Sequence, residues 1–527
     1  MPALFEAEMR YVTYYFHSLE KANMLYAKGK DTAVDGLKIF VLEWGNIQSA
    51  QHWVANASAD RDIATRLCSR FPDAGANLLS IRLHPKDRIQ WLEVALSSAR
   101  KLGDQIAEAV HLGNLGMAFS DMAQMREAIE YHEKSMILDR ELGNINGEAS
   151  DLNNLGIIYQ HLGDYDKAYS CFEQAHAFFI KTGDKKGEGV ALLGFGSVNI
   201  SKGEYNIACE NLEMGLIIFR ETQDLMFEGK ALNNLALVHA RTGKNSQALS
   251  LYQQSLELMR LIGDRRGESR VLGNLGLLNL SSGNMDQALN FFEQCLETSR
   301  MLNDRQNISN ALSNLGLVYA ALGLYPKAIQ YHEQHLALVQ EIGYREGEIN
   351  ALGNLGLAFA ALGDYETANS FYERQLILSR EIGDRRGESA ALGNMGIAFK
   401  NLGNFEKALD LYNLQLLLSR EISERQVEGD ALSNIGNVLL STGRLLESIS
   451  YHQSAIKIYR ELGNHRYEAI SIFNLAIAYA ENGDNAQAIS LGKKALVICE
   501  PLSDPNTGMI QKQIADWEST VSTKIRR

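Results

Sequence analysis

The sequence predicts an all-α solenoid of antiparallel helix pairs, and two observations carry this prediction. An asparagine, followed by an apolar and then a small residue, recurs at one constant interval from Asn114 through Asn154 to Asn474. Only six of the 527 residues are proline, and one of these lies between residues 86 and 500, whereas 44 residues are glycine. Long helices separated by glycine turns fit this composition, because proline interrupts helices and glycine punctuates them.

Three rows of residues define the repeat. The first row has an asparagine in nine of ten repeats, and only Gly194 breaks it. Two positions later the residue is Gly or Ala, and further along each repeat a third row has Ala, or Ser448 in one repeat. The asparagine row consists of Asn114, Asn154, Asn234, Asn274, Asn314, Asn354, Asn394, Asn434 and Asn474.

Each repeat is predicted to form two helices, as residues 265–304 illustrate. Apolar residues fall at helical spacing up to Leu278, Gly283 interrupts the pattern, and a second helical pattern follows. Asp264 is suited to cap the first helix, and Glu268 to its first turn. The small residues should let the two helices of a repeat approach closely. Stacking such pairs then produces one continuous core.

The chain divides into three predicted segments. Residues 1–104 contain three of the four tryptophans, and we interpret them as a helical N-terminal cap with degenerate repeats. Residues 105–504 hold ten 40-residue repeats. Residues 505–527 should form a C-terminal capping helix and tail, because solenoid ends need a polar outer face.

The L-x-N-L-G-x-x-[YF] start, the turn glycine and the alanine of the second helix resemble the tetratricopeptide repeat (TPR). The usual repeat has about 34 residues, and the extra length here lies in the second helix and its exit, as in 299–305. Segments such as 331–336 and 383–388 resemble the long repeats of Pins-type proteins, a form also found in kinesin light chains. The resemblance implies a TPR superhelix whose function is binding. The run 14–16, followed by 42–47 and Trp53, is similar to the helical region preceding TPRs in STAND-type signalling ATPases.

Two departures from these families narrow the expectation. The family's chaperone-tail clamp needs a lysine just before the key asparagine and an asparagine three positions after it. Here the preceding residue is never lysine, and only Asn437 meets the second requirement. No G-x-x-x-x-G-K-[ST] phosphate loop occurs, so the ATPase of the STAND proteins is not expected.

Composition argues against several other classes of protein. The formal net charge is −13 and no basic block occurs, so we expect no nucleic-acid partner. No apolar run approaches the roughly 18 residues of a membrane span, so we expect no membrane association. The segment Met1–Glu20 does not read as a signal peptide, and the five cysteines are scattered. These observations favour a cytoplasmic protein with reduced thiols.

Catalytic, metal and cofactor signatures are also missing from the sequence. His132, His332 and His452 occupy one register of separate repeats, so they cannot share a metal ion, and we expect partly buried histidines on a helix face. No nucleophile motif appears. We therefore expect no enzyme activity, no metal and no cofactor, and buried thiols at the cysteines of the second helices.

The asparagine row is the one candidate site. Asparagine is a poorer helix former than alanine by about 0.5 kcal/mol, so its recurrence within a helix needs a reason. One interpretation is structural, with the amide bonded to a neighbouring first helix; the other is functional, with the amide bound to the backbone of an extended peptide in a concave groove. Both interpretations stay open. The small residues that precede four of the asparagines should leave room for a ligand; they are Gly273, Ser313, Gly353 and Gly393.

The function expected from the sequence is a non-catalytic protein- or peptide-binding scaffold, with an extended peptide or protein segment as its partner. The flanks of the row are mixed in charge, with Lys230, Arg270 and Asp430 among neutral residues, which favours backbone recognition. The alternative is a regulatory sensor arm acting on a separate signalling or transcription partner. The sequence sets no oligomeric state.

Overall fold

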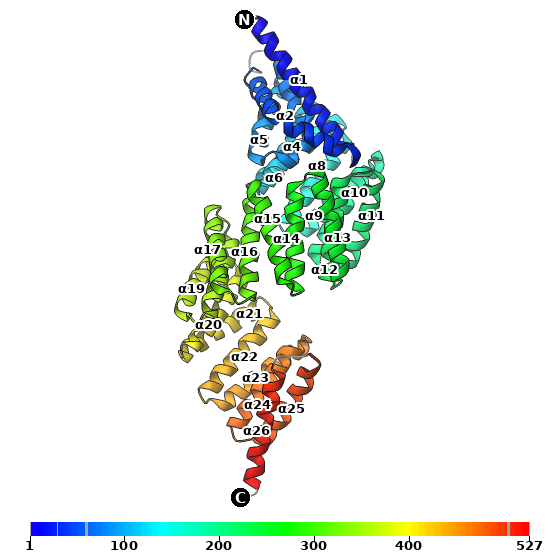
Figure 1. Cartoon of the computed structure of the whole chain (residues 1–527). Helices are drawn as coiled ribbons and strands as arrows, with labels where there is room; N and C mark the ends of the chain where they lie inside the picture. Colours follow the sequence, from blue (N-terminus) through cyan, green and yellow to red (C-terminus); the bar gives the residue numbers. More distant parts are fainter. Residues whose placement is uncertain (1, 29, 58–61, 503–505, 526–527) are drawn as a thin grey trace. The chain divides into compact units, whose positions relative to one another are not determined.

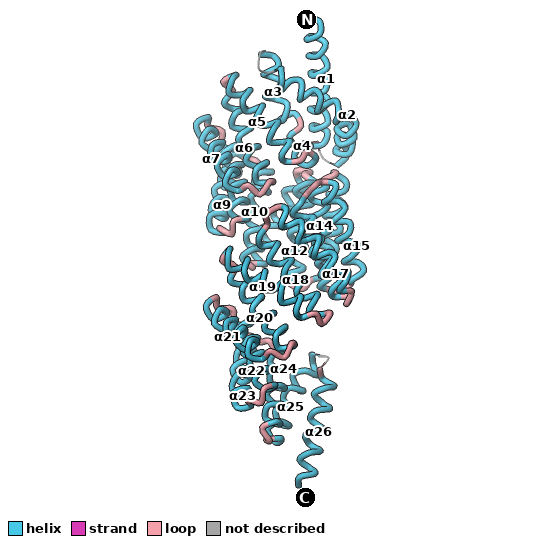
Figure 2. The backbone as a smooth tube through the Cα atoms, turned by 90° about the vertical axis from the view of Figure 1, so that its left-hand side faces the viewer, coloured by secondary structure: helices cyan, strands magenta, loops and turns pink. Residues whose placement is uncertain are grey.

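A computed structural model describes residues 2–28, 30–57, 62–502 and 506–525. Within these ranges every regular element is a helix, and the helices follow one another as antiparallel pairs joined by short loops (Figures 1 and 2). The predicted all-α solenoid is confirmed. The chain divides into two compact parts, Met1–Ala311 and Leu312–Arg527, whose border falls inside one helix. We call them the N-terminal part and the C-terminal part and describe each by itself.

The N-terminal part begins with five helices that precede the repeats. They are α1 (Pro2–Ala27), α2 (Lys30–Ala57), α3 (Asp62–Ala74), α4 (Ala76–Arg82) and α5 (Pro85–Leu102). The repeat helices that follow are α6 (Gln105–Asp121), α7 (Met125–Leu142), α8 (Ile145–His161), α9 (Tyr165–Thr182), α10 (Lys185–Lys202), α11 (Tyr205–Glu221), α12 (Leu225–Arg241), α13 (Asn245–Ile262), α14 (Arg265–Ser281) and α15 (Met285–Met301).

The helices of the remaining repeats keep the same spacing. They are α16 (Arg305–Ala321), α17 (Tyr325–Glu341), α18 (Arg345–Ala361), α19 (Tyr365–Ile382), α20 (Arg385–Asn401), α21 (Phe405–Glu421), α22 (Arg425–Ser441), α23 (Leu445–Glu461), α24 (His465–Glu481) and α25 (Asn485–Cys499). A 3₁₀ turn, η1 (Glu500–Leu502), and α26 (Thr507–Ile525) follow.

The predicted helix boundaries in 265–304 have their expected chemistry. The Asp264 carboxylate accepts a hydrogen bond from the Gly267 backbone N–H at 2.9 Å and so caps α14. Between α14 and α15, Gly283 has a φ of +78°, a conformation that glycine adopts without steric cost. Helix α14 therefore begins after Asp264 and ends before Gly283, as the sequence predicted.

The small residue two positions after each asparagine receives one large side chain from the second helix. A Cβ atom placed on Gly276 would collide with the ring of Phe292, which comes from α15 and is completely buried. Gly356 and Gly396 receive Tyr372 and Tyr412 in the same way. The close approach of the two helices is thus confirmed, and a ring seated on a glycine is its physical form.

Three histidines occupy this ring position, so the expectation that they are partly buried is wrong. His132, His332 and His452 are at most 1% exposed. Their rings lie against Gly116, Gly316 and Gly436, where four other repeats place a phenylalanine or tyrosine and one places Leu212. These histidines therefore fill the core.

Repeat boundaries carry a charged contact that the sequence pattern did not indicate. Glu388 is 6% exposed and accepts hydrogen bonds from Arg380 Nε at 2.7 Å and Arg385 Nη1 at 2.9 Å. Burial alone would raise the pKa of Glu388, but the two arginines outweigh burial and hold the pKa below its usual value. Glu268 and Glu428 are bound by arginine pairs at the same register.

The two ends of the array have different coverings. The long helices α1 and α2 pack on each other, and α5 packs on α6 as a second helix packs on the next first helix. At the other end, α26 packs on α25 and buries Ile510, Ile514 and Trp517. The start of the predicted capping segment, Asp504–Pro505, lies outside the described residues. The segment borders at 104 and 504 stay predictions.

Removal of one whole repeat tests the independence of the repeats. Deletion of 385–424 removes α20 and α21 and joins α19 to α22 in the same register, so we expect a monodisperse, helical protein. Deletion of 385–404 removes α20 alone and leaves the apolar face of α21 uncovered, so we expect aggregation. Circular dichroism and size-exclusion chromatography compare the two. Equal aggregation of both proteins would contradict a solenoid with nearest-neighbour contacts.

The substitution Glu388→Gln tests the charged boundary contact. At pH 7 we expect the free energy of unfolding to fall by about 1–3 kcal/mol, because two charge-assisted hydrogen bonds are weakened. The pKa of Glu388 is lowered by folding, so its contribution is present above the usual glutamate pKa and is lost as the pH falls through the folded value. The difference from wild type in urea denaturation should therefore vanish at low pH. Glu373→Gln, at an exposed residue of α19, is the control, and an equal loss there would refute the account.

Candidate functional site

The asparagine row lies in the middle of the first helices, and every member is half-buried. The position follows from the helix around it. In α18, Leu355 is completely buried and Gly356 receives Tyr372, whereas Leu357 is 51% exposed. Asn354 lies between the buried and the exposed stripes, so its amide remains accessible from one side.

The first helices form the inner side of each stretch of repeats. Successive first helices contact one another, as α6 with α8, α8 with α10 and α18 with α20 do, whereas successive second helices in the described chain make no comparable contact. Within each part, the repeats therefore bend toward their first helices. We call the exposed surface of the first helices that carries the asparagine row the asparagine face.

Hydrogen bonding distinguishes two kinds of asparagine in the row. Asn274 Nδ2 donates to Asn233 Oδ1 at 2.9 Å, and Asn233 Nδ2 donates to Asn234 Oδ1 at 3.3 Å, so the structural role holds at this boundary. The other seven side chains have no hydrogen-bond partner within the described chain: Asn114, Asn154, Asn314, Asn354, Asn394, Asn434 and Asn474.

The break in the row at Gly194 has a steric cause. A Cβ atom on Gly194 would collide with the ring of Phe172, which comes from the preceding repeat. Phe172 thus lies against both Gly156 and Gly194, and an asparagine side chain would not fit between them. The exception comes from core packing between neighbouring repeats.

The residues just before the asparagines do not all leave room for a ligand, and the prediction is wrong at Gly353 and Gly393. The space beside Gly353 is filled by the Gln375 side chain, and that beside Gly393 by Gln415. Both glutamines come from the second helix of the same repeat. These glycines therefore serve packing within the repeat.

An apolar row that sequence reasoning left unused runs beside the asparagines. It occupies the third position after eight of the nine asparagines, one helical turn along the same face; after Asn434 this position is Asn437. The signal was present in the sequence, since aliphatic residues recur at a register that the core does not use. Its most exposed members are Met117, Ile157, Leu277, Leu317, Leu357 and Ile397, with exposures of 37–51%.

The charges beside the asparagine face differ between the two parts. In the N-terminal part, Lys230 Nζ lies 4.7 Å from the centre of the Phe227 ring, and neither Lys230 nor Arg270 has an ion-pair partner in the described chain. Burial lowers the pKa of Lys230; Asp264 opposes this shift and Arg270 adds to it.

In the C-terminal part, Asp430 is engaged by its own chain. Its carboxylate accepts hydrogen bonds from Tyr459 Oη at 2.7 Å and from Gln426 Nε2 at 3.1 Å. Burial raises the pKa of Asp430, and the two hydrogen bonds partly offset the effect. The acidic flank expected at Asp430 is therefore tied to neighbouring side chains.

Burial keeps several histidines and cysteines of the array uncharged. Within the described ranges, no three His, Cys, Asp or Glu side chains are grouped so that they could hold a metal ion. Burial lowers the pKa of His332 and His335 to about 4, so both rings are neutral at pH 7. Cys171 and Cys209 are half-buried, which corrects the expectation of full burial, and burial raises the pKa of both thiols.

No helix in the described ranges has both the length and the apolar character that crossing a bilayer requires.

Family models described as tetratricopeptide repeat match most of the array. One model matches residues 148–221, 227–301, 307–376 and 428–500, and a second matches 112–145 and 391–426. No curated protein sequence matches the chain.

Several solved structures are similar to the chain in fold. BtubC from P. vanneervenii is 20% identical with a TM-score of 0.39, covering 42% of this chain and 92% of that one. The quorum sensor NprR from B. thuringiensis is 14% identical with a TM-score of 0.48, covering 68% and 99%.

A STAND protein with a tetratricopeptide repeat sensor from Pyrococcus horikoshii is 15% identical with a TM-score of 0.48. The match covers 66% of this chain and 54% of the STAND protein, so the chain spans about half of that protein's length. At these identities the likeness concerns the fold alone. The matched family models cover more than half of the residues, and the chain therefore belongs to the tetratricopeptide repeat family, whose scaffold is typical of protein-interaction modules.

Proposed function

We propose that this chain is a non-catalytic scaffold that binds an extended peptide or protein segment along the asparagine face. One observation carries the proposal: seven asparagines at one register are half-exposed and have no hydrogen-bond partner in the described chain. An amide has two donor hydrogens and one acceptor oxygen, which match the acceptors and donors of a peptide backbone. A backbone bound in this way needs no particular side chain beside the amide.

The spacing of the row suits an extended chain. Packed helices lie about 8–10 Å apart, and an extended backbone advances about 3.3 Å per residue. One asparagine per repeat therefore meets about every third residue of the ligand. A row of such contacts fixes the direction and register of the bound segment.

The apolar row supplies the second half of the contact. Leu357 and Ile397 are 51% and 42% exposed beside Asn354 and Asn394. Covering an aliphatic side chain contributes up to about 1.5–3 kcal/mol when its burial is complete. The proposed ligand thus combines a backbone accessible to the asparagines with apolar side chains directed at this row.

The chemistry of the face also favours binding over catalysis. Amide and aliphatic side chains are poor acids, bases and nucleophiles, and the buried histidines of the core do not reach this surface. The proposal therefore includes no cofactor. It places the protein in the cytoplasm, which the lack of disulfide bonds among the described cysteines supports.

Replacement of Asn354, Asn394, Asn434 and Asn474 by alanine tests the role of the row in the C-terminal part. Peptides selected from a displayed random library on the wild-type protein serve as ligands. Each lost amide contact costs about 0.5–1.5 kcal/mol, so we expect affinity to fall at least about tenfold. Melting should not fall, because these amides have no partner within the described chain and alanine is the better helix former.

Two further variants make this test specific. Asn413→Ala with Gln453→Ala removes exposed amides from second helices and should leave affinity unchanged. Asn274→Ala removes the bond to Asn233, a 5% exposed side chain, and should lower the melting temperature. Unchanged affinity of the fourfold variant, measured by isothermal titration calorimetry, would remove the row from the binding site.

A further inference from the structure

One arginine departs from a contact that three other repeats make. In those three repeats, the side chain eight positions before the asparagine row contacts the residue that precedes the first helix of the next repeat. Lys186 pairs with Asp224 at 2.7 Å, and Arg386 pairs with Glu424 at 2.6 Å. Asn464 donates to Gln426 at 3.0 Å in the same arrangement.

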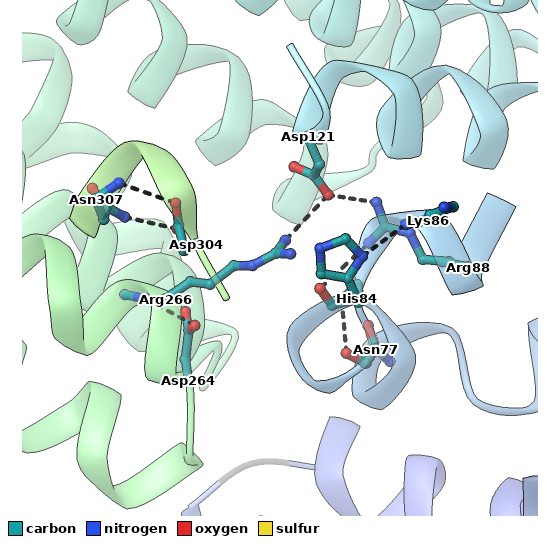
Figure 3. A network of polar contacts seen from close by, with 11 residues as sticks. Asn77, His84, Lys86, Arg88, Asp121, Asp264, Arg266, Asp304 and Asn307 are labelled. Atoms are coloured by element: carbon teal, nitrogen blue, oxygen red, sulfur yellow. Dashed lines mark hydrogen bonds and ion pairs between the residues drawn. The ribbon is translucent and has the colours of Figure 1, made fainter. Parts of the chain in front are cut away.

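Arg266 does not make this contact with the next repeat, although its local sequence is the same as that of Arg386. Residues 262–269 and 382–389 both read I-G-D-R-R-G-E-S. The equivalent contact would pair Arg266 with Asp304, but Asp304 is hydrogen-bonded to Asn307. Arg266 instead points to Asp121, 145 residues earlier in the chain (Figure 3). Since the local sequence is identical, tertiary structure is what redirects Arg266.

Asp121 connects three separate helices of the N-terminal part. Its Oδ2 atom accepts a hydrogen bond from Arg88 Nη2 of α5 and lies 3.4 Å from Arg266 Nη1 of α14 (Figure 3). Arg88 is only 10% exposed at its side chain, whereas Asp121 is 40% and Arg266 26% exposed. The Arg88 contact is therefore protected, and the Arg266 contact is open to solvent and ions.

The helices around this cluster also meet. In the N-terminal part α2 contacts α13 and α4 contacts α14. Leu37 of α2 lies against Gly263, and a cavity of about 390 Å³ remains between Trp44, His84, Arg266 and Met301. The boundary between these helices therefore includes an open pocket and is less continuously packed than a protein core.

The contact between Arg266 and Asp121 joins α14 to α6 across the intervening repeats. Arg266 and Asp121 belong to first helices that are four repeats apart, so their contact brings the two ends of this stretch of the asparagine face together. Burial lowers the pKa of His161 in α8, and the positive charge of Arg270 in α14 lowers it further.

We propose that Arg88, Asp121 and Arg266 form a reversible clasp that closes the repeats α6 to α14 against the N-terminal helices. Arg88 holds Asp121 in place, and the Arg266 contact is the one that opens. Opening widens the access to Asn114 and Asn154; this last step rests on the proposed function, whereas the clasp itself does not.

A distance measurement in the full-length chain tests the clasp. Spin labels at Leu42→Cys and Glu257→Cys report the separation of α2 and α13, and both residues are exposed. The half-buried Cys171 and Cys209 are replaced by serine so that they take no label. We expect one narrow distance distribution at low salt, and a longer, broader one in Arg266→Met.

High salt and a matched variant show whether the Arg266 contact causes the change in the distance distribution. At 1 M NaCl the screening length falls to about 3 Å, so the wild type should approach the Arg266→Met distribution while that variant changes little. Arg386→Met has the same local sequence and loses the Glu424 pair, and it should leave the distribution unchanged. Identical distributions for wild type and Arg266→Met at both salt concentrations, with folding verified by circular dichroism, would overturn the clasp. An equal shift in Arg386→Met would overturn its specificity.

Peptide affinity tests the access step separately. Peptides selected on the wild-type protein should bind Arg266→Met several-fold more tightly if their binding depends on Asn114 and Asn154. A longer distance with unchanged affinity would overturn the access step. The fourfold asparagine variant tests the proposed function, and its substitutions all lie in the C-terminal part. The distance measurement tests the clasp in the N-terminal part. Failure of the clasp and failure of the proposed function therefore give different results.

Discussion

The structure depends on one steric constraint, the seating of a large side chain on a residue with little or no side chain. Gly276 with Phe292 and Gly396 with Tyr412 show the same arrangement at the same register of two repeats. The ring on glycine sets the spacing of the two helices, and repetition of the spacing aligns successive first helices. Histidine can take the ring position, as at His132, because shape matters there more than polarity.

This constraint also determines which side chains remain for function. With the two positions after Asn354 used by the core, the asparagine and the leucine three positions after it are left on the inner surface. The packing of the repeat alone therefore aligns the asparagine row with the apolar row beside it. A binding surface of this kind follows directly from the packing of the repeat.

Charged residues, in contrast, distinguish repeats that the core makes alike. The buried glutamates at 268, 388 and 428 have the same arginine partners at each boundary, so they act as a regular part of the array. Arg266 and Arg386 share one local sequence and differ in partner. Equivalent residues of different repeats therefore acquire different partners where segments distant in the sequence come into contact.

The sequence by itself determined the helix pairs, their boundaries and the register of the asparagine row, because periodicity, capping and turn glycines are local signals. It did not determine which asparagines bond within the chain, since Asn274 and Asn354 stand in the same motif and only Asn274 has a partner. It also could not show that glutamines fill the space beside Gly353 and Gly393, or that Phe172 excludes an asparagine at 194. These outcomes, like the pairing of Arg266 with Asp121, depend on contacts between helices, and a local sequence carries no information about the residue that tertiary structure places opposite it.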